Sequence, residues 1–227
     1  MKLALFDLDH TLLPIDSDYS WGQYTLDIGW CDPGHFKARN DEFFAQYQAG
    51  VLDVHAYVRF ATEAIRLRGQ AAAEAAREDF LREVIRPAIR PEALALVQAH
   101  RAAGDRLVLV TATNEFVTRP IADLFGIDDL VATRLARDGA GWLTGEIEGV
   151  PTMREGKVTR MGQWLSERGL DWAQVEATFY SDSPNDLPLL ERVQQPVATN
   201  PDPRLRQVAL ARGWRILDLF GPPAPGH

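Results

Sequence analysis

The sequence predicts an α/β protein in which a Rossmann-like parallel sheet carries a helical bundle inserted after its first strand. Short apolar runs typical of buried strands occur at 3–6, 107–110 and 177–180, and weaker runs occur near 196–198 and 214–217. Helical patterns separate these runs, and such alternation is typical of a parallel sheet covered by helices. About a hundred residues separate the first two runs, far more than one crossover helix needs.

The long segment 14–86 accounts for this spacing. It is rich in aromatic and helix-forming residues, and its aromatic residues recur at three- and four-residue steps. This spacing is typical of the inward faces of packed helices. We therefore expect a small inserted helical domain over 14–86, and a core domain built from 1–13 and 87–227.

The next element expected is a helix directly before the strand at 107–110. Pro91 begins the stretch PEALALVQAHRAAG and Gly104 ends it. Proline is favoured in the first helical turn and glycine just after the last one. The sequence therefore predicts a helix that leads from Pro91 into the second strand.

Two further elements are expected between the second and third strands. The stretch 130–149 places two strand-like arms around Asp138 and Gly139. An Asp-Gly pair between such arms is a common signal for a β-hairpin. An amphipathic helix that contains Lys157 follows the hairpin and leads toward the strand at 177–180.

Composition excludes several classes of partner and site. Thirty-two acidic residues against twenty-four basic ones give a net charge of −8, which argues against nucleic acid or an anionic membrane as the main partner. No run approaches the roughly 18 apolar residues that a membrane helix needs, and Asp7 interrupts the first apolar run too early for a signal peptide. Cys31 is the only cysteine, so we expect no disulfide within the chain and a reducing, cytoplasmic location.

Polar side chains follow three of the predicted strands at the point where each strand ends. Asp7 and Asp9 follow the first strand, Thr111 follows the second, and Asp182 and Asp186 follow the strand at 177–180. In an open parallel sheet, ligands bind beyond the carboxyl ends of the strands. A single such residue is usually a helix cap or a turn residue. Sites after three different strands instead predict one functional site at this edge.

Lys157 is the remaining candidate for this functional site. The chain has three lysines against twenty-one arginines. A lysine on a helix is usually a solvated charge, but a chain that uses arginine so heavily has a reason to keep an ammonium group here. An ammonium group can approach a phosphate as a compact point charge.

Taken in order, the stretches DLDHT (7–11), Thr111, Lys157 and DSPND (182–186) resemble the four sequence motifs of the haloacid dehalogenase superfamily. The first stretch has the DxDx[TV] form of the phosphatase branch. The resemblance spans 1–13 and 87–218. The place and size of the insertion resemble the helical cap domain of the phosphoserine phosphatase-like subfamily, and the stretch TGEIEG before the lysine also resembles that subfamily. The chain departs from that subfamily at TAT (111–113) and at the glycine-free DSPND, which leaves the substrate open.

The resemblance implies a phosphatase that hydrolyses a small phosphorylated metabolite. Asp7 would attack phosphorus and become an aspartyl phosphate. Asp9, easily protonated among so many carboxylates, would give a proton to the leaving alkoxide and then activate water. Thr111 and Lys157 would hold the phosphoryl oxygens.

A phosphate dianion repels a carboxylate nucleophile, so this chemistry also implies Mg²⁺, which prefers oxygen ligands and keeps several waters. Its expected ligands are Asp7, Asp182 and the backbone carbonyl of Asp9. Asp186 would orient the ion or its waters. Asn185 would donate to the phosphoryl group or to the same waters.

Two residues of the cap would then recognise the substrate. Asp16 lies nine residues after Asp7, where the subfamily carries a Glu that receives an ammonium group, and Asp18 is a nearby substitute. Asp16 would otherwise be a helix N-cap. Arg59 lies where the subfamily holds an Arg for a carboxylate. Both roles together imply phosphoserine, whereas the role of Asp16 alone implies an amino alcohol ester such as histidinol phosphate.

Other activities on the same residues are less favoured. A dehalogenase does not need the acid Asp9, and a phosphonatase needs a cap lysine, for which only Lys37 is present. A receiver-like signalling protein that accepts a phosphoryl group remains an alternative, as does a phosphatase of this superfamily for a different metabolite. The oligomeric state stays open.

Overall fold

Strand β1 (Lys2–Phe6) lies inside a parallel sheet of six strands in the order β3-β2-β1-β6-β7-β8. The computed structural model describes residues 1–49 and 51–221, and the sheet is counted over these residues. The other strands of the sheet are β2 (Arg106–Asn114), β3 (Asp129–Thr133), β6 (Glu176–Ser181), β7 (Gln195–Thr199) and β8 (Arg215–Leu217). The sequence predicted all of these strands except β3.

The register of the sheet brings the ends of β1 and β6 together beside β2. The strand β2 is longer than predicted and continues to Asn114, so Thr111 lies within it and not after it. Phe6, the last residue of β1, is opposite Leu109 of β2 and Tyr180 of β6. Because the strands are parallel, the residues that follow these three positions lie at one edge. Asp7 and Asp182 therefore come from neighbouring strands.

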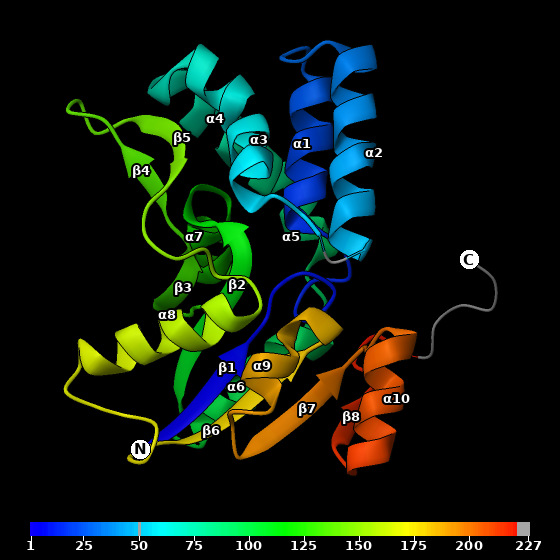
Figure 1. Ribbon diagram of the computed structural model, residues 1–227, viewed down its shortest axis with the longest axis vertical. Coiled ribbons are helices and arrows are strands. Elements are labelled where there is room, and N and C mark those ends of the chain that lie inside the picture. The colour runs from blue at the N-terminus through cyan, green and yellow to red at the C-terminus, as the bar shows by residue number, and fades with distance from the viewer. Residues whose placement is uncertain (50, 222–227) are drawn as a thin grey trace.

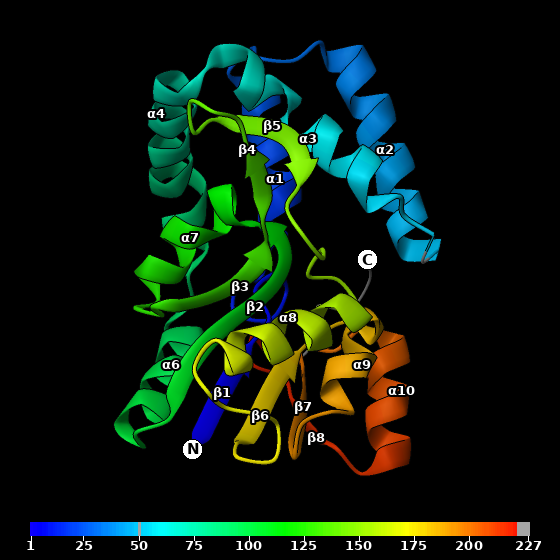
Figure 2. The ribbon, with the colours of Figure 1, turned by 60° about the vertical axis from the view of Figure 1, so that its left-hand side comes forward.

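Helices cover both faces of the sheet (Figures 1 and 2). Leu3 and Leu5 pack on one face with the buried residues of α8, α9 and α10, and Ala4 and Phe6 pack on the other with those of α6 and α7. This alternation follows from the two-residue repeat of a strand. The helices and helical turns of this part are α5 (Arg86–Ala88), α6 (Pro91–Ala102), α7 (Glu115–Leu124), α8 (Glu155–Ser166), η2 (Pro184–Asp186), α9 (Leu187–Leu190) and α10 (Pro203–Arg212).

The segment after β1 is helical, as expected, and its helices lie together beyond one edge of the sheet (Figure 1). They are α1 (Ser17–Asp27), α2 (Pro33–Ala49), α3 (Val54–Arg68), α4 (Gln70–Phe80) and the π-helical turn η1 (Leu81–Ile85). The Trp21 and Phe80 rings meet edge to face with their centroids 5.2 Å apart, and both are buried. The division into a cap over 14–86 and a core stays a prediction, and residues 222–227 of the core lie outside the described part.

The predicted hairpin is present as β4 (Leu135–Arg137) and β5 (Leu143–Ile147). Its first arm is shorter than predicted, because residues 129–133 join the main sheet as β3 instead. The hairpin lies against α3, so it extends the group of helices inserted after β1 (Figure 2). Asp138 holds the turn, since its Oδ1 accepts hydrogen bonds from two backbone N–H groups, those of Ala140 and Trp142. None of the helices in the described residues has the length and apolar composition to span a bilayer.

Candidate active site

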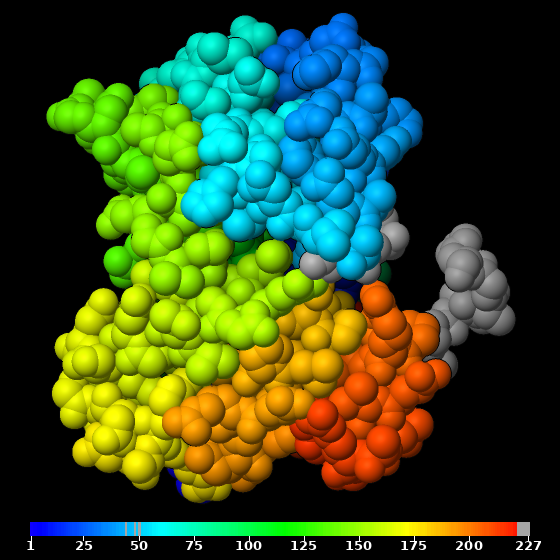
Figure 3. Space-filling view, viewed as in Figure 1, coloured from blue at the N-terminus to red at the C-terminus, as the bar shows by residue number. Residues whose placement is uncertain are grey.

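A cavity of about 310 Å³ joins the edge of the sheet to the insertion helices. The surface is drawn in between α1–α4 and the sheet part of the molecule (Figure 3). The lining from the sheet and the segments after its strands contains Asp7, Asp9, Thr111, Lys157, Asp182, Asn185 and Asp186. The lining from the segment inserted after β1 contains Asp16, Asp18, Tyr19, Phe43, Tyr47 and Tyr57. Every predicted site residue except Arg59 thus lines one cavity.

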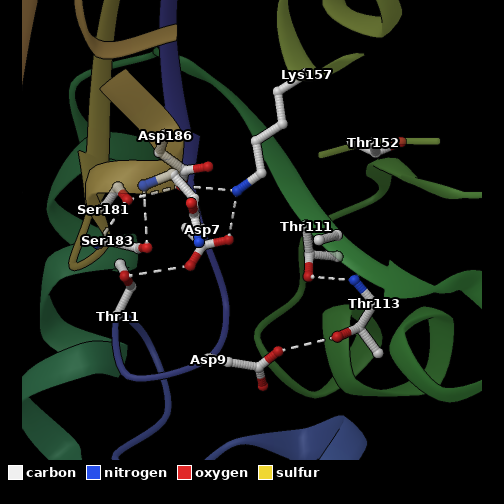
Figure 4. A network of polar contacts seen from close by, with 12 residues as sticks. Asp7, Asp9, Thr11, Thr111, Thr113, Thr152, Lys157, Ser181, Ser183 and Asp186 are labelled. Atoms are coloured by element: carbon white, nitrogen blue, oxygen red, sulfur yellow. Dashed lines mark hydrogen bonds and ion pairs between the residues drawn. The ribbon is translucent and has the colours of Figure 1, made fainter. Parts of the chain in front are cut away.

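Lys157 connects two of the carboxylates in this cavity. Its Nζ lies 2.8 Å from Asp7 Oδ1 and 2.7 Å from Asp186 Oδ2, and the residue is only 3% exposed (Figure 4). Ser181 also donates to Asp186 Oδ2, at 2.7 Å. Asp186 is therefore fixed by two donors, and Lys157 is fixed by two acceptors.

The same contacts set the charge states of the group. Burial lowers the pKa of Lys157, but Asp186 and Asp7 outweigh it, and the pKa is raised above its ordinary value. Burial raises the pKa of Asp7 to about 6, while Lys157 opposes this change and Asp186 adds to it. Lys157 is thus a permanent cation that helps to keep the Asp7 carboxylate charged.

Asp182 faces Asp7 across a threonine. Thr11 Oγ1 lies 3.5 Å from Asp7 Oδ2 and 3.3 Å from Asp182 Oδ1. Burial raises the pKa of Asp182 well above its ordinary value, and the negative charges of Asp7 and Asp186 add to this. The two carboxylates therefore repel each other unless a cation or a proton intervenes.

Asp7 and Asp182 are candidate ligands of a metal ion, together with the backbone carbonyl of Asp9. In residues 1–49 and 51–221, no group of three or more histidine, cysteine, aspartate or glutamate side chains is arranged to hold a metal. Mg²⁺ does not need such a group, since one or two carboxylates and several waters are enough. The oxygen donors and the excess of negative charge fit Mg²⁺.

The side chain of Asp9 points away from this group, toward α1 and β2 (Figure 4). Its Oδ1 accepts a 2.6 Å hydrogen bond from the backbone N–H of Ser17, and its Oδ2 accepts a 3.0 Å bond from Thr113 Oγ1. Burial raises the pKa of Asp9 well above its ordinary value, and Asp16 adds to this. A carboxyl group in this state can hold a proton that it later gives away.

Thr111 and Asn185 present polar groups to the cavity. Thr111 Oγ1 accepts a hydrogen bond from the backbone N–H of Thr113, at 3.2 Å. Its hydroxyl proton is therefore free to be donated elsewhere. Asn185 Oδ1 accepts from Arg154 Nη2 at 3.4 Å, which leaves the amide N–H groups of Asn185 available as donors.

The structure separates the two residues that were predicted to recognise the substrate. Asp16 lines the cavity, but it is also the N-cap of α1, because its Oδ1 accepts a 2.9 Å bond from the backbone N–H of Tyr19. Arg59 does not line the cavity. Its Nη1 lies 3.2 Å from Oε2 of Glu146 on β5, and its side chain is 48% exposed. The structure therefore does not bring Arg59 to the site.

Several residues of the site were not predicted. Thr11 and Thr113 contact the carboxylates of the first motif, and Ser181 holds Asp186. Thr11 and Thr113 lie in the quoted stretches DLDHT and TAT, so their place in the motifs was the available signal. No local pattern marked Tyr47 or Tyr57, because aromatic residues in the insertion are mostly packing residues.

The fold and the site geometry define a class of protein. The haloacid dehalogenase-like hydrolase family matches residues 4–191, which is most of the chain. The chain therefore belongs to this family. The predicted family and the predicted fold are both confirmed.

Individual proteins are similar over almost the whole chain. A histidinol-phosphatase of Neisseria meningitidis serogroup C is 44% identical over 220 residues, which cover 96% of this chain and 99% of that protein. A solved structure of a protein of unknown function from Bordetella pertussis Tohama I is 48% identical, has a TM-score of 0.91, and matches 96% of this chain and 99% of its own. A phosphoserine phosphatase solved as a phospho-aspartyl intermediate analogue shares the fold, with a TM-score of 0.63 at 18% identity and coverage of 95% and 92%.

These similarities decide between the classes that the sequence left open. The family is one of hydrolases, and the full-length relative is a phosphatase. The chain is accordingly an enzyme of the phosphatase class, as predicted. The receiver-like alternative is not supported.

Proposed function

We propose that the chain is a Mg²⁺-dependent phosphomonoesterase that works through an aspartyl phosphate on Asp7. We further propose that its substrate is the phosphate ester of a small amine, with histidinol phosphate favoured over phosphoserine. The observation that carries the proposal is the single cavity in which Asp7 and Lys157 at the sheet edge face the acidic side chains of the cap. One end suits a phosphate and the other suits a cation.

The phosphate end is proposed to work as follows. Asp7 attacks phosphorus, and the bond between phosphorus and the ester oxygen breaks. The ester oxygen leaves with the electron pair of that bond and receives a proton from Asp9. Lys157 and Thr111 donate to the phosphoryl oxygens. When bound, Mg²⁺ would offset the negative charge of the carboxylates and of the phosphate.

Asp9 then takes a proton from the water that attacks the phosphoryl group, and inorganic phosphate and free Asp7 result. The raised pKa of Asp9 supports its role as the acid that protonates the leaving group, because the carboxyl must hold a proton before the substrate reacts. The hydrogen bond from Thr113 supports the role of Asp9 as the base that activates water, because this bond holds the carboxylate toward β2 once the proton has left. Asp186 acts by positioning Lys157, which it contacts at 2.7 Å.

Two observations support an amine that lacks a carboxylate. Arg59, the residue expected to hold a carboxylate, is paired with Glu146 outside the cavity. Of the other cations at the cavity, Lys157 is held by Asp7 and Asp186, and Arg204 is 68% exposed and lies 3.5 Å from Asp202. The similarity to a histidinol-phosphatase over 96% of the chain agrees with such a substrate.

The test is to compare kcat/KM with Mg²⁺ for histidinol phosphate, phosphoserine and p-nitrophenyl phosphate. We expect the highest value for histidinol phosphate. A clear preference for phosphoserine would overturn the choice between the amines. A preference for an amine-free ester would overturn the substrate class and leave the phosphatase chemistry in place.

A further inference from the structure

Asp18 of α1 has one paired and one unpaired carboxylate oxygen. The hydroxyl of Tyr57 donates to Oδ2 at 2.5 Å. Oδ1 is buried and has no hydrogen-bond partner in the described residues. A buried polar atom without a partner is costly, so this oxygen is a place where a ligand group would be stabilised.

The surroundings of Asp18 limit the chemistry of that group. Asp18 lines the cavity together with the rings of Tyr19, Phe43, Tyr47 and Tyr57. The Phe43 and Tyr57 rings meet edge to face with their centroids 5.4 Å apart, so the Tyr57 hydroxyl is held in place. Aromatic faces beside a carboxylate attract cations.

The protein itself supplies no cation to this carboxylate. In residues 1–49 and 51–221, no lysine, arginine or histidine forms an ion pair with Asp18. The other charge beside it is that of Asp16, whose Oδ1 is already used to cap the helix. Asp16 and Asp18 are thus not equivalent, although both line the cavity.

The titration of Asp18 is consistent with a missing cation. Burial raises its pKa to about 7, and Asp16 adds to this, while the hydrogen bond from Tyr57 opposes it. A bound cation would stabilise the charged form and lower the pKa again.

We infer that Asp18, held by Tyr57, is the specificity-determining residue that binds a cationic nitrogen of the substrate's alcohol. Asp16 then serves chiefly to cap α1. The inference rests on the proposed function, and it assigns recognition of the amine to a different residue from the one that the family resemblance indicates. The ligand group is an ammonium or imidazolium ion beside the aromatic side chains of α2 and α3.

The test uses two inhibitors that occupy opposite ends of the cavity. Histidinol carries the cationic nitrogens without a phosphate, and inorganic phosphate carries the phosphate group without the nitrogens. Inhibition constants of both are measured against p-nitrophenyl phosphate turnover in the wild type and in Asp18→Asn. Asp16→Asn is the matched comparison because asparagine also caps a helix, and Asp27→Asn is the control for an exposed acid on the same helix.

We expect Asp18→Asn to raise the inhibition constant of histidinol roughly tenfold or more, as the loss of a charge-assisted hydrogen bond predicts. The constant for phosphate should change far less, and Asp27→Asn should change neither. Tyr57→Phe, which keeps the charge but removes the donor, should raise the histidinol constant by a smaller factor. The histidinol constant of Tyr57→Phe also tests the inference if Asp18→Asn folds poorly.

Two results would overturn the inference while the proposed function stands. In both, the wild type prefers histidinol phosphate. In the first, Asp18→Asn weakens histidinol and phosphate equally, or neither. In the second, Asp16→Asn has the larger effect on histidinol. If the wild type instead prefers amine-free esters and histidinol does not inhibit it, both the substrate proposal and the inference fall.

Discussion

Lys157 Nζ lies 2.8 Å from Asp7 Oδ1, although the two residues are 150 positions apart in the chain. The contact joins the first helical turns of α8 to the end of β1, and both residues are nearly buried. Because Asp186 holds the same Nζ, the lysine cannot leave Asp7 without leaving two buried carboxylates uncompensated. The pair therefore links the charge of the candidate nucleophile to the stability of the fold.

Replacing Lys157 by Met should impair both activity and stability. We expect kcat to fall by roughly 10²–10³, as when a donor to a developing charge is removed. The free energy of unfolding at neutral pH should fall by about 3–5 kcal/mol, because Asp7 and Asp186 lose their buried partner. Steady-state rates and urea unfolding measure the two effects. Arg160→Met on the same helix is the control, and an equal loss there would contradict the assignment.

Asp9→Asn should discriminate between leaving groups. An alkoxide such as that of histidinol needs a proton to depart, whereas p-nitrophenolate leaves readily without one. We expect kcat to fall by roughly 10²–10⁴ on the alkyl ester, with a smaller fall on p-nitrophenyl phosphate. Equal losses on the two substrates would argue against Asp9 as the acid. Thr113→Val removes the donor to Asp9 Oδ2. This variant should lower kcat on both substrates, again more on the alkyl ester, but by smaller factors than Asp9→Asn.

Activity should require Mg²⁺ and should be suppressed by Ca²⁺. Ca²⁺ accepts more oxygen ligands at longer distances than Mg²⁺, so it can engage both oxygens of Asp7 and leave none to attack phosphorus. The measurement is turnover after EDTA treatment, then with each ion added back. Undiminished turnover in EDTA would remove the metal from the account.

The stability of the metal-free protein should depend on the protonation of Asp18. Its pKa is raised from 3.8 to about 7 on folding, so the folded state holds a proton that the unfolded state releases. Stability from this group is therefore complete at low pH and is lost as pH rises through the window from about 4 to about 7, by at most about 4 kcal/mol. Asp18→Asn should reduce this dependence, which unfolding measured at about pH 5 and about pH 8 would detect. If Asp18→Asn and Asp27→Asn showed the same dependence of stability on pH, the assignment of this dependence to Asp18 would be contradicted.

Most of the sheet could be predicted because its strands are short apolar runs with helices between them. The strand β3 could not, because the stretch 130–137 looks like one hairpin arm. In the structure Leu130 and Val131 pair with β2, and the chain then leaves the sheet for β4. Which part of a strand-like stretch joins which sheet depends on packing against distant segments, and local sequence does not encode it.

Much of the candidate site follows from strand ends, whereas the recognition of the substrate does not. Asp7 and Asp182 meet because β1 and β6 end at one edge, whereas Thr111 reaches them from within β2 and not from its end. The predicted role of Arg59 rested only on the resemblance of its sequence stretch to the subfamily. In the structure Arg59 pairs with Glu146 of the hairpin, which lies 87 residues further along the chain. Thr11 reaches Asp7 and Asp182 because the chain turns over residues 8–11, where the backbone N–H of Thr11 donates to the carbonyl of Leu8. Composition alone does not mark such a turn.

The central claim is that Asp7 carries the phosphoryl group during turnover. The most direct measurement is to stop the reaction of histidinol phosphate with acid within one turnover and to locate phosphate on the peptides by mass spectrometry. We predict phosphate on Asp7 in the wild type and none in Asp7→Asn, which should fold normally by circular dichroism but be inactive. Turnover without phosphate on Asp7, or an Asp7→Asn variant that keeps substantial activity, would contradict the account.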